Sequence, residues 1–170
     1  EIKSMQGLHV YHYFLSNCAQ RVNLTLAEKG LDWTPHSVSL LTKQNTKDEY
    51  LSINPSGLVP AMVRNGVVIT ESIDILRYIE AQFPTPPLYP EGSSRRQQVG
   101  QWMDGATENH NAVVKTYMYA MTFGGAKSPE EMERYLAQQE DPGLKAFHQQ
   151  ATAGFSQDQI SAAERAVCLI

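Results

Sequence analysis

The first part of the chain carries apolar positions whose spacing changes from strand-like to helix-like and back. Residues 8–14, LHVYHYF, are rich in β-branched and aromatic side chains and predict a strand. Ala19, Val22 and Leu26 then recur at the spacing of one helix face, which predicts a helix. Residues 31–40 alternate loosely and predict a second strand. A strand, a helix and a strand of these lengths form a βαβ unit, in which the two strands run parallel.

Local signals mark both ends of this helix. Ser16 or Asn17 can cap its start, because a short polar side chain there accepts a hydrogen bond from the first turn. Gly30 follows Glu28-Lys29 and ends the helix, since glycine readily adopts the left-handed conformation after a last turn.

A hairpin and a second helix follow. Residues 41–56 are polar with scattered apolar positions and predict a loop with a short helix. Residues 60–70, PAMVRNGVVIT, predict a β-hairpin, and its Asn65-Gly66 turn favours the type I′ geometry. Residues 72–82, SIDILRYIEAQ, predict an amphipathic helix with Ser72 as its N-cap.

The composition changes after residue 82. Residues 83–94, FPTPPLYPEGSS, contain four prolines and a glycine, and no strand pattern follows them. We therefore expect an α/β domain at residues 8–84, a linker at 85–93 and an all-helical domain at 94–170.

The second domain is predicted to consist of helices separated by breaks. Residues 94–123 are mostly compatible with helix, and Gly124-Gly125 ends that stretch. Ser128-Pro129 begins another helix, with proline at its first position and acidic residues in its first turn. Asp141-Pro142-Gly143 predicts a turn, and Ser156–Gln159 fits a capping box at the start of a last helix.

Composition and charge exclude several classes of protein. The 170 residues are 42% hydrophobic, which is enough for a packed core, and the net charge of −4 argues against a nucleic-acid surface. Two cysteines, Cys18 and Cys168, cannot form the disulfide framework of a secreted domain, and Cys168 is expected to be a core residue. No apolar run is long enough to cross a membrane, and the first residues lack the apolar core of a signal peptide. The sequence thus predicts a cytoplasmic protein with no membrane partner.

The junction between the first strand and the first helix carries candidate chemistry. Ser16 and Cys18 lie where a helix begins, and the unpaired N–H groups there favour an anion by about 0.3–1 kcal/mol. A thiolate is such an anion, and it can belong either to Cys18 or to a bound thiol ligand. A buried, inert role for Cys18 is an equal alternative.

Two further segments can hold polar groups of a ligand. A cis peptide fits at Val59-Pro60, where it would expose the Val59 backbone to an extended peptide, although an ordinary trans proline at a strand start fits as well. Thr70-Glu71-Ser72 lies at a strand-to-helix boundary and can hold a carboxylate and an ammonium, or act as a plain cap. No metal site is expected, because His9 and His12 are three apart on a strand and face opposite sides.

Together these segments resemble the glutathione transferase family. YHYFLSNCAQRVNLTLAEKG is similar to the zeta-class N-terminal motif, NPSGLVPAMVRNG to the segment with the cis-proline, and ITESIDILRYIE to the segment that binds the γ-glutamyl end of glutathione. SPEEMERYL and GFSQDQISAAE resemble bacterial β-etherase-like and dehalogenase-like members. The resemblance implies a thioredoxin-like N-terminal domain and an all-α C-terminal domain, of which the last helices would be incomplete here.

The resemblance also implies roles for individual residues. Ser16 would donate a hydrogen bond to the glutathione sulfur, and Cys18 would be a second nucleophile. The zeta pattern has serine where this chain has Asn17. The other residues expected at the glutathione site are Asn17, Gln44, Asn45, Val59, Pro60, Glu71 and Ser72.

Several alternatives concern the reaction itself. Leu15, Asn111 and Tyr117 are candidates for contacting a small apolar or aromatic electrophile, although packing is the favoured role for Tyr117 and a surface or core role is favoured for Asn111. The expected reaction is attack by the glutathione thiolate, leading to conjugation, ether cleavage or isomerisation, with glutathione as co-substrate in a homodimer of a detoxifying enzyme. The alternatives are a thiol transferase or reductive dehalogenase that depends on Cys18, and a non-catalytic glutathione-binding module.

Overall fold

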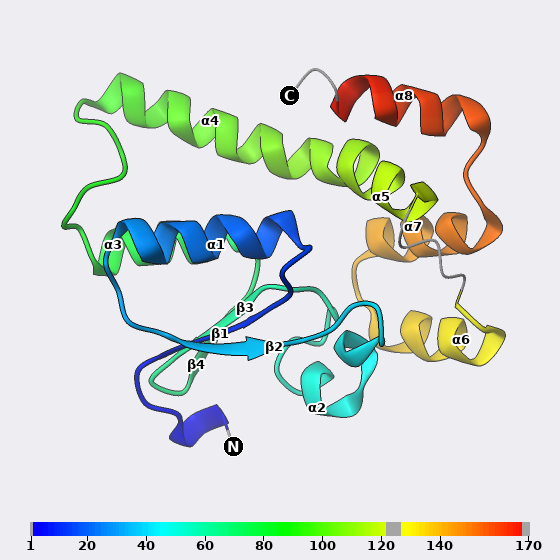
Figure 1. Cartoon of the computed structure of the whole chain (residues 1–170), viewed down its shortest axis with the longest axis horizontal. Helices are drawn as coiled ribbons and strands as arrows, with labels where there is room; N and C mark the ends of the chain where they lie inside the picture. The colour runs from blue at the N-terminus through cyan, green and yellow to red at the C-terminus, as the bar shows by residue number, and fades with distance from the viewer. Residues whose placement is uncertain (1, 122–126, 168–170) are drawn as a thin grey trace. The chain divides into compact units, whose positions relative to one another are not determined.

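The computed structural model describes residues 2–121 and 127–167. Within it the chain forms two units, Glu1–Gly100 and Gln101–Ile170, and each is described by itself. Figure 1 labels their helices and strands.

The first unit is built on a four-stranded sheet with the strand order β2-β1-β3-β4. The strands are β1 (Leu8–His12), β2 (Thr34–Ser37), β3 (Ala61–Arg64) and β4 (Val67–Ile69). β2 runs parallel to β1, while β3 and β4 are antiparallel to their neighbours. The predicted βαβ unit and hairpin are therefore both confirmed.

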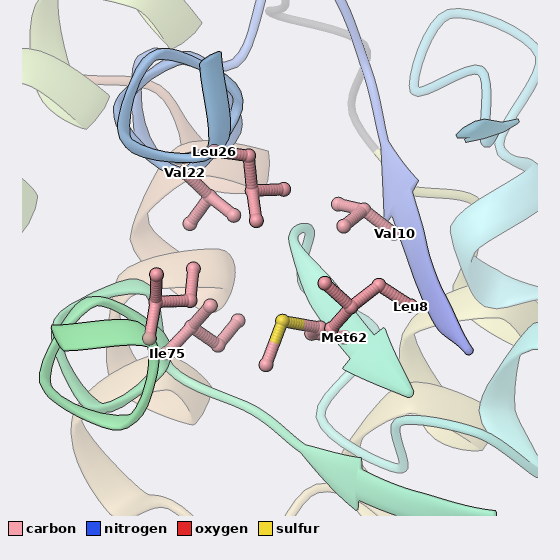
Figure 2. Close-up of a cluster of buried hydrophobic side chains, with 7 residues drawn as sticks. Leu8, Val10, Val22, Leu26, Met62 and Ile75 are labelled. Atoms are coloured by element: carbon pink, nitrogen blue, oxygen red, sulfur yellow. The ribbon is translucent and has the colours of Figure 1, made fainter. Parts of the chain in front are cut away.

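Helices α1 (Asn17–Glu28) and α3 (Ser72–Gln82) pack side by side on one face of this sheet. Figure 2 shows side chains from the two helices directed toward those of β1 and β3. The core consists of Leu8, Val10, Val22, Leu26, Met62, Ile75 and Ile79. The apolar stripe predicted for the first helix is thus the face that is buried.

The hairpin turn has the backbone that its sequence predicts. Asn65 and Gly66 both have positive φ angles, 48° and 82°, as a type I′ turn requires. The Asn65 side chain accepts a hydrogen bond of 2.8 Å from the Gly7 amide, which ties the turn to the segment before β1. A Cβ atom on Gly66 would lie 2.7 Å from the Lys3 carbonyl oxygen, so glycine is needed there for space as well as for φ.

The start of α3 differs from the prediction. Glu71, not Ser72, is the N-cap residue, and it makes no side-chain capping hydrogen bond. Ser72 is instead the first helical residue and is buried. The chain enters α3 through Glu71 with φ +61° and ψ 116°, a conformation that a propensity argument does not predict for a glutamate.

The segment between α3 and α4 (Ser93–Asn109) contains no regular structure and is fastened to the first unit. The Lys29 ammonium lies 2.5 Å from the Glu80 carboxylate and donates a 2.6 Å hydrogen bond to the Pro86 carbonyl oxygen. The same carboxylate accepts hydrogen bonds from the amides of Leu88 and Tyr89. The two units meet in sequence at Gly100, inside α4, so the domain limits given by the linker composition stay a prediction.

Two short helices, η2 (Gln44–Thr46) and α2 (Asp48–Leu51), lie in the segment predicted to be a loop with a short helix, and η1 (Ile2–Ser4) precedes the sheet. After α4 the described elements are a π-helix η3 (His110–Lys115), α5 (Thr116–Met121), α6 (Pro129–Gln138), α7 (Pro142–Ala153) and α8 (Gln157–Val167). In these described parts no helix is long and apolar enough to cross a membrane.

The helix starts of the second unit test the local signals. The helix predicted to begin at Ser128-Pro129 is confirmed as α6, and Ser128 and Glu131 also form a reciprocal capping box there. The capping box predicted at Ser156 and Gln159 is confirmed by their two hydrogen bonds at the start of α8. The turn predicted at residues 141–143 is wrong. Asp141 caps α7, with proline as its first helical residue, because an aspartate followed by proline suits a helix start as well as a turn. Gly124-Gly125 and Cys168 lie outside the described residues.

Candidate functional site

The register of the sheet brings the candidate segments of the first unit to one end of it. The last residue of β1, His12, pairs with the last residue of β2, Ser37, and Tyr11 pairs with Ala61 at the start of β3. The last residue of β4, Ile69, pairs with the second residue of β3. The chain segments that leave β1, β2 and β4, and the segment that enters β3, therefore all meet at this end of the sheet. They contain Ser16, Asn17, Cys18, Gln44, Asn45, Val59, Pro60, Glu71 and Ser72.

Of the two caps that the sequence predicts for α1, Ser16 and Asn17, the structure has Ser16. Its hydroxyl oxygen accepts a hydrogen bond of 3.2 Å from the Ala19 amide. No described residue accepts the hydroxyl proton of Ser16. The side chain is therefore held at the positive end of a twelve-residue helix with a proton that it can donate to an anion.

The neighbours of Ser16 differ in exposure. Leu15 is 45% exposed, and Asn17 is exposed with its side-chain oxygen accepting a 2.9 Å hydrogen bond from the Cys18 amide. Cys18 is partly exposed in the first turn of α1 and carries a reduced thiol. Both the hydroxyl of Ser16 and the thiol of Cys18 thus belong to the same helix start.

The segment before β3 presents backbone groups. The Val59-Pro60 peptide bond is cis, so of the two possibilities left open by the sequence the structure has this one. No hydrogen bond of the Val59 backbone is found among the described residues. An extended peptide can pair with the Val59 backbone N–H and C=O groups as an added strand would.

Gln44 and Asn45 lie in η2, on the segment that follows β2. The Gln44 side-chain oxygen accepts a 2.7 Å hydrogen bond from the Ser39 amide, which shapes this segment from within. The Asn45 amide nitrogen donates a 2.8 Å hydrogen bond to the Gly57 carbonyl oxygen. Asn45 therefore connects this segment to the one that ends at Val59.

Glu71 is the N-cap residue of α3 and Ser72 is its first residue, and the Glu71 side chain makes no capping hydrogen bond to the first turn. Glu71 is exposed and has a positive φ angle, which residues other than glycine rarely adopt. Such a conformation costs about 1–3 kcal/mol, and strain of this kind concentrates at functional sites. The arrangement combines a carboxylate side chain with an anion-attracting helix start.

The second unit holds the remaining candidates. Tyr117 lies in α5 and is half-buried, and Asn111 lies in η3 with a side chain outside the described part of the chain. Their role against an electrophile stays a prediction. Among the described residues no group of three or more His, Cys, Asp or Glu side chains is gathered as a metal site requires.

Reasoning from the sequence missed Tyr50 and Asn54. Both are buried and donate hydrogen bonds to the Leu58 carbonyl oxygen, at 2.5 and 2.8 Å. An asparagine in a loop is ordinarily exposed, and only the 3% exposure of Asn54 in the structure shows that its side chain holds the loop from inside.

Comparison with known proteins agrees with this arrangement. Residues 15–82 match the family described as "Glutathione S-transferase, N-terminal domain", a range that includes every candidate of the first unit.

Similarity to curated proteins extends beyond residues 15–82. The chain is 36% identical over 117 residues to "Glutathione S-transferase Z1" of Arabidopsis thaliana, covering 66% of this chain and 53% of that protein. It is 36% identical over 89 residues to "Maleylacetoacetate isomerase" of Rattus norvegicus, covering 51% and 41%. The chain thus spans about half the length of the curated relatives that it matches.

Solved structures share the fold over most of the chain. The β-etherase LigF from Sphingobium matches with a TM-score of 0.77 and 26% identity, covering 96% of this chain and 70% of that one. A theta-class glutathione S-transferase from Xanthomonas axonopodis, solved with glutathione bound, matches with a TM-score of 0.61 and 23% identity, covering 96% and 72%. The predicted fold class, a thioredoxin-like domain followed by helices, is therefore confirmed.

Proposed function

We propose that this protein is a glutathione transferase that activates the glutathione thiol for attack on a small hydrophobic or aromatic electrophile. The observation that carries the proposal is the Ser16 hydroxyl at the start of α1, which accepts from the Ala19 amide and keeps its own proton for an external acceptor. The family match of residues 15–82 supports glutathione as the source of that acceptor.

Ser16 would act by favouring the thiolate over the thiol. A hydrogen bond to a charged acceptor is worth about 1.5–3 kcal/mol, and the helix N-terminus adds about 0.3–1 kcal/mol. Since 1.36 kcal/mol corresponds to one pKa unit, the two effects together lower a thiol pKa by roughly 1.5–3 units from its usual value of about 8.5. Most of the bound glutathione would then be ionised near neutral pH, and the thiolate would attack an electrophilic carbon.

The rest of glutathione would be held by the neighbouring segments. The Val59 backbone N–H and C=O would pair with the cysteinyl part, as in strand addition. The start of α3, with Ser72, would receive the γ-glutamyl carboxylate, and Glu71 its ammonium. Gln44 and Asn45, on the segment after β2, would contact the glycyl end.

Other parts of the proposal concern the electrophile and the setting. Leu15, Asn111 and Tyr117 would contact the electrophile. The names of similar proteins, a β-etherase and a maleylacetoacetate isomerase, support ether cleavage and isomerisation as reactions of the same thiolate. A homodimer and a cytoplasmic location, both expected from the sequence, belong to this proposal as well.

The test is a comparison of Ser16→Ala with Cys18→Ala and with a hydroxyl control. In Ser16→Ala the pKa of bound glutathione, followed by its thiolate absorbance, should rise by about 1–2 units, and kcat/KM with a generic aromatic electrophile should fall about 10–100-fold. Ser52→Ala removes the hydroxyl of the residue that follows α2, which donates to the Glu49 carbonyl oxygen, and should leave both values unchanged. Binding of glutathione without any turnover would instead favour a binding module.

A second candidate function depends on Cys18. Its partly exposed thiol lies in the first turn of α1, two residues after Ser16. Its thiolate can attack the glutathione sulfur of a glutathionyl disulfide or conjugate, forming a mixed disulfide and displacing the other half as the leaving group. Such a thiol transferase or reductive dehalogenase would lose its activity in Cys18→Ala and keep much of it in Ser16→Ala. The same pair of variants therefore separates the two functions, because conjugation shows the opposite pattern.

A further inference from the structure

Three side chains hold the loop that leads into Val59. Two of them come from residues before the loop, and the third comes from the first residue of the loop, Asn54. The Asn45 amide donates to the Gly57 carbonyl oxygen, and the Tyr50 hydroxyl and the Asn54 amide both donate to the Leu58 carbonyl oxygen. We call these three residues, Asn45, Tyr50 and Asn54, the loop donors. They occupy the two carbonyl groups that immediately precede Val59.

The loop donors belong to one network of hydrogen bonds around the loop. Tyr50 is 4% exposed and Asn54 is 3% exposed, so their hydrogen bonds are shielded from water. Burial raises the pKa of the Tyr50 phenol, which stays protonated and keeps donating over the physiological range. The Asn54 side-chain oxygen also accepts from the amide and the hydroxyl of Ser56, at 3.1 and 2.7 Å, which fixes the orientation of its amide group.

The loop itself is shaped for close approach. Gly57 has a φ angle of +66°, and a Cβ atom there would lie 3.2 Å from the Asn45 carbonyl oxygen. Any side chain would therefore push the η2 segment away from the loop. The position needs glycine both for its backbone angle and for the space that lets Asn45 reach it.

These contacts distinguish Val59 from the residues before it. Gly57 and Leu58 have their carbonyl groups engaged inside the protein, whereas the Val59 backbone makes no hydrogen bond among the described residues. A group that is to pair with a ligand peptide must be held in place before the ligand arrives, because ordering it during binding lowers affinity.

We infer that Asn45, Tyr50 and Asn54 are positioning residues that preset the Val59 backbone for the peptide of glutathione. They act on the binding of the glutathione backbone. The contact with the glutathione thiol is the role proposed for Ser16, at the start of α1. This inference rests on the proposed glutathione transferase function and assigns to Asn45 a role inside the protein in addition to the glycyl contact proposed for it.

The inference predicts a split between binding and chemistry. In Tyr50→Phe and Asn54→Ala the Kd and KM for glutathione should rise about tenfold, the change expected when two hydrogen bonds to Val59 are weakened. The value of kcat at saturating glutathione should stay within about threefold of wild type. Ser16→Ala should show the reverse, with a large loss of kcat and a smaller change in Kd.

The experiment is calorimetric titration of the full chain with glutathione, together with steady-state kinetics. Tyr78→Phe is the matched control, because it also removes the hydroxyl of a partly buried tyrosine. That hydroxyl accepts a hydrogen bond from Arg64 and lies away from this loop. Tyr50→Phe is the deciding variant if Asn54→Ala does not fold, since it removes a single hydroxyl and keeps the ring.

Each outcome has a separate meaning. A raised Kd in Tyr50→Phe, with Tyr78→Phe unchanged, supports the inference. Wild-type binding that Tyr50→Phe leaves unaltered, with only a lowered melting temperature, overturns it while the proposed function stands. No binding of glutathione by the wild type at millimolar concentration would overturn the proposed function and the inference together.

Discussion

The ion pair between Lys29 and Glu80 offers a sharp test of how the first unit is held together. The Lys29 side chain is fully buried and that of Glu80 is 17% exposed. Besides Glu80, the ammonium has the Pro86 carbonyl oxygen at 2.6 Å. Glu80→Ala therefore leaves a buried cation with a single neutral partner, a change that costs about 3–5 kcal/mol in unfolding free energy.

A pair of substitutions separates the charge from the packing. Lys29→Met removes the cation and leaves Glu80 with its backbone donors and some solvent, so it should cost less, about 1–3 kcal/mol. The double variant Lys29→Met/Glu80→Ala removes both charges and should be more stable than Glu80→Ala alone. The coupling free energy of the cycle should then be about 2–3 kcal/mol.

The assay is urea unfolding followed by the fluorescence of Trp33, which packs against the core of the first unit. The other tryptophan, Trp102, is 66% exposed in the second unit, and Trp102→Phe removes its signal from all variants. Arg77→Ala is the matched control, because it breaks an exposed ion pair with Asp74 on the same helix and should cost under about 1 kcal/mol.

The pH dependence gives a second reading of the same pair. Desolvation raises the pKa of the Glu80 carboxyl. The hydrogen bonds from Lys29 and from the amides of Tyr89 and Leu88 together lower it by more than desolvation raises it, so the net pKa is below its usual value. This stabilisation is present above the pKa of the unfolded carboxyl, about 4.3, and is lost as the pH falls through the folded value. A loss in Glu80→Ala no larger than that in Arg77→Ala would refute the reasoning.

Two further predictions use the same unfolding measurement. Gly66→Ala should destabilise the chain by at least about 1 kcal/mol, because its Cβ atom meets the Lys3 carbonyl at a positive φ angle, whereas Gly100→Ala, with open space in α4, should be neutral or stabilising; equal effects would contradict this. Burial, then repulsion from Lys127 and Lys115, lowers the pKa of His148 to about 3. The unfolded chain alone gains this proton, so stability followed by circular dichroism should fall by about 2 kcal/mol from pH 7 to pH 5, and His148→Gln should lack that component.

Most elements of the fold could be predicted from local sequence. The Asn65-Gly66 turn, the Ser156 capping box and the α1 stripe each depend on residues within one or two turns of chain, so they can be predicted without tertiary contacts. Where one local signal serves two structures, the prediction was wrong. Asp141-Pro142 suits both a turn and a helix start, and it starts α7, whose Leu144 and His148 are buried.

The candidate site divides in the same way. Ser16 could be predicted as one of two possible capping acceptors because a cap is a local contact, and the family resemblance indicated the other segments. The contacts that hold those segments could not be predicted. Asn54 reaches a carbonyl inside a loop, and Lys29 reaches Pro86 across 57 positions of sequence. Local spacing carries no information about such partners.

Local sequence patterns predicted most of the helices and strands and narrowed the cap of α1 to Ser16 or Asn17. Only the tertiary structure decided that the segments after β1, β2 and β4 meet at the start of β3, and that Gly57 and Leu58 are held while Val59 is left to pair. The reason is physical. Caps and turns satisfy backbone groups within a few residues, whereas buried polar groups must find partners wherever packing brings a donor and an acceptor together.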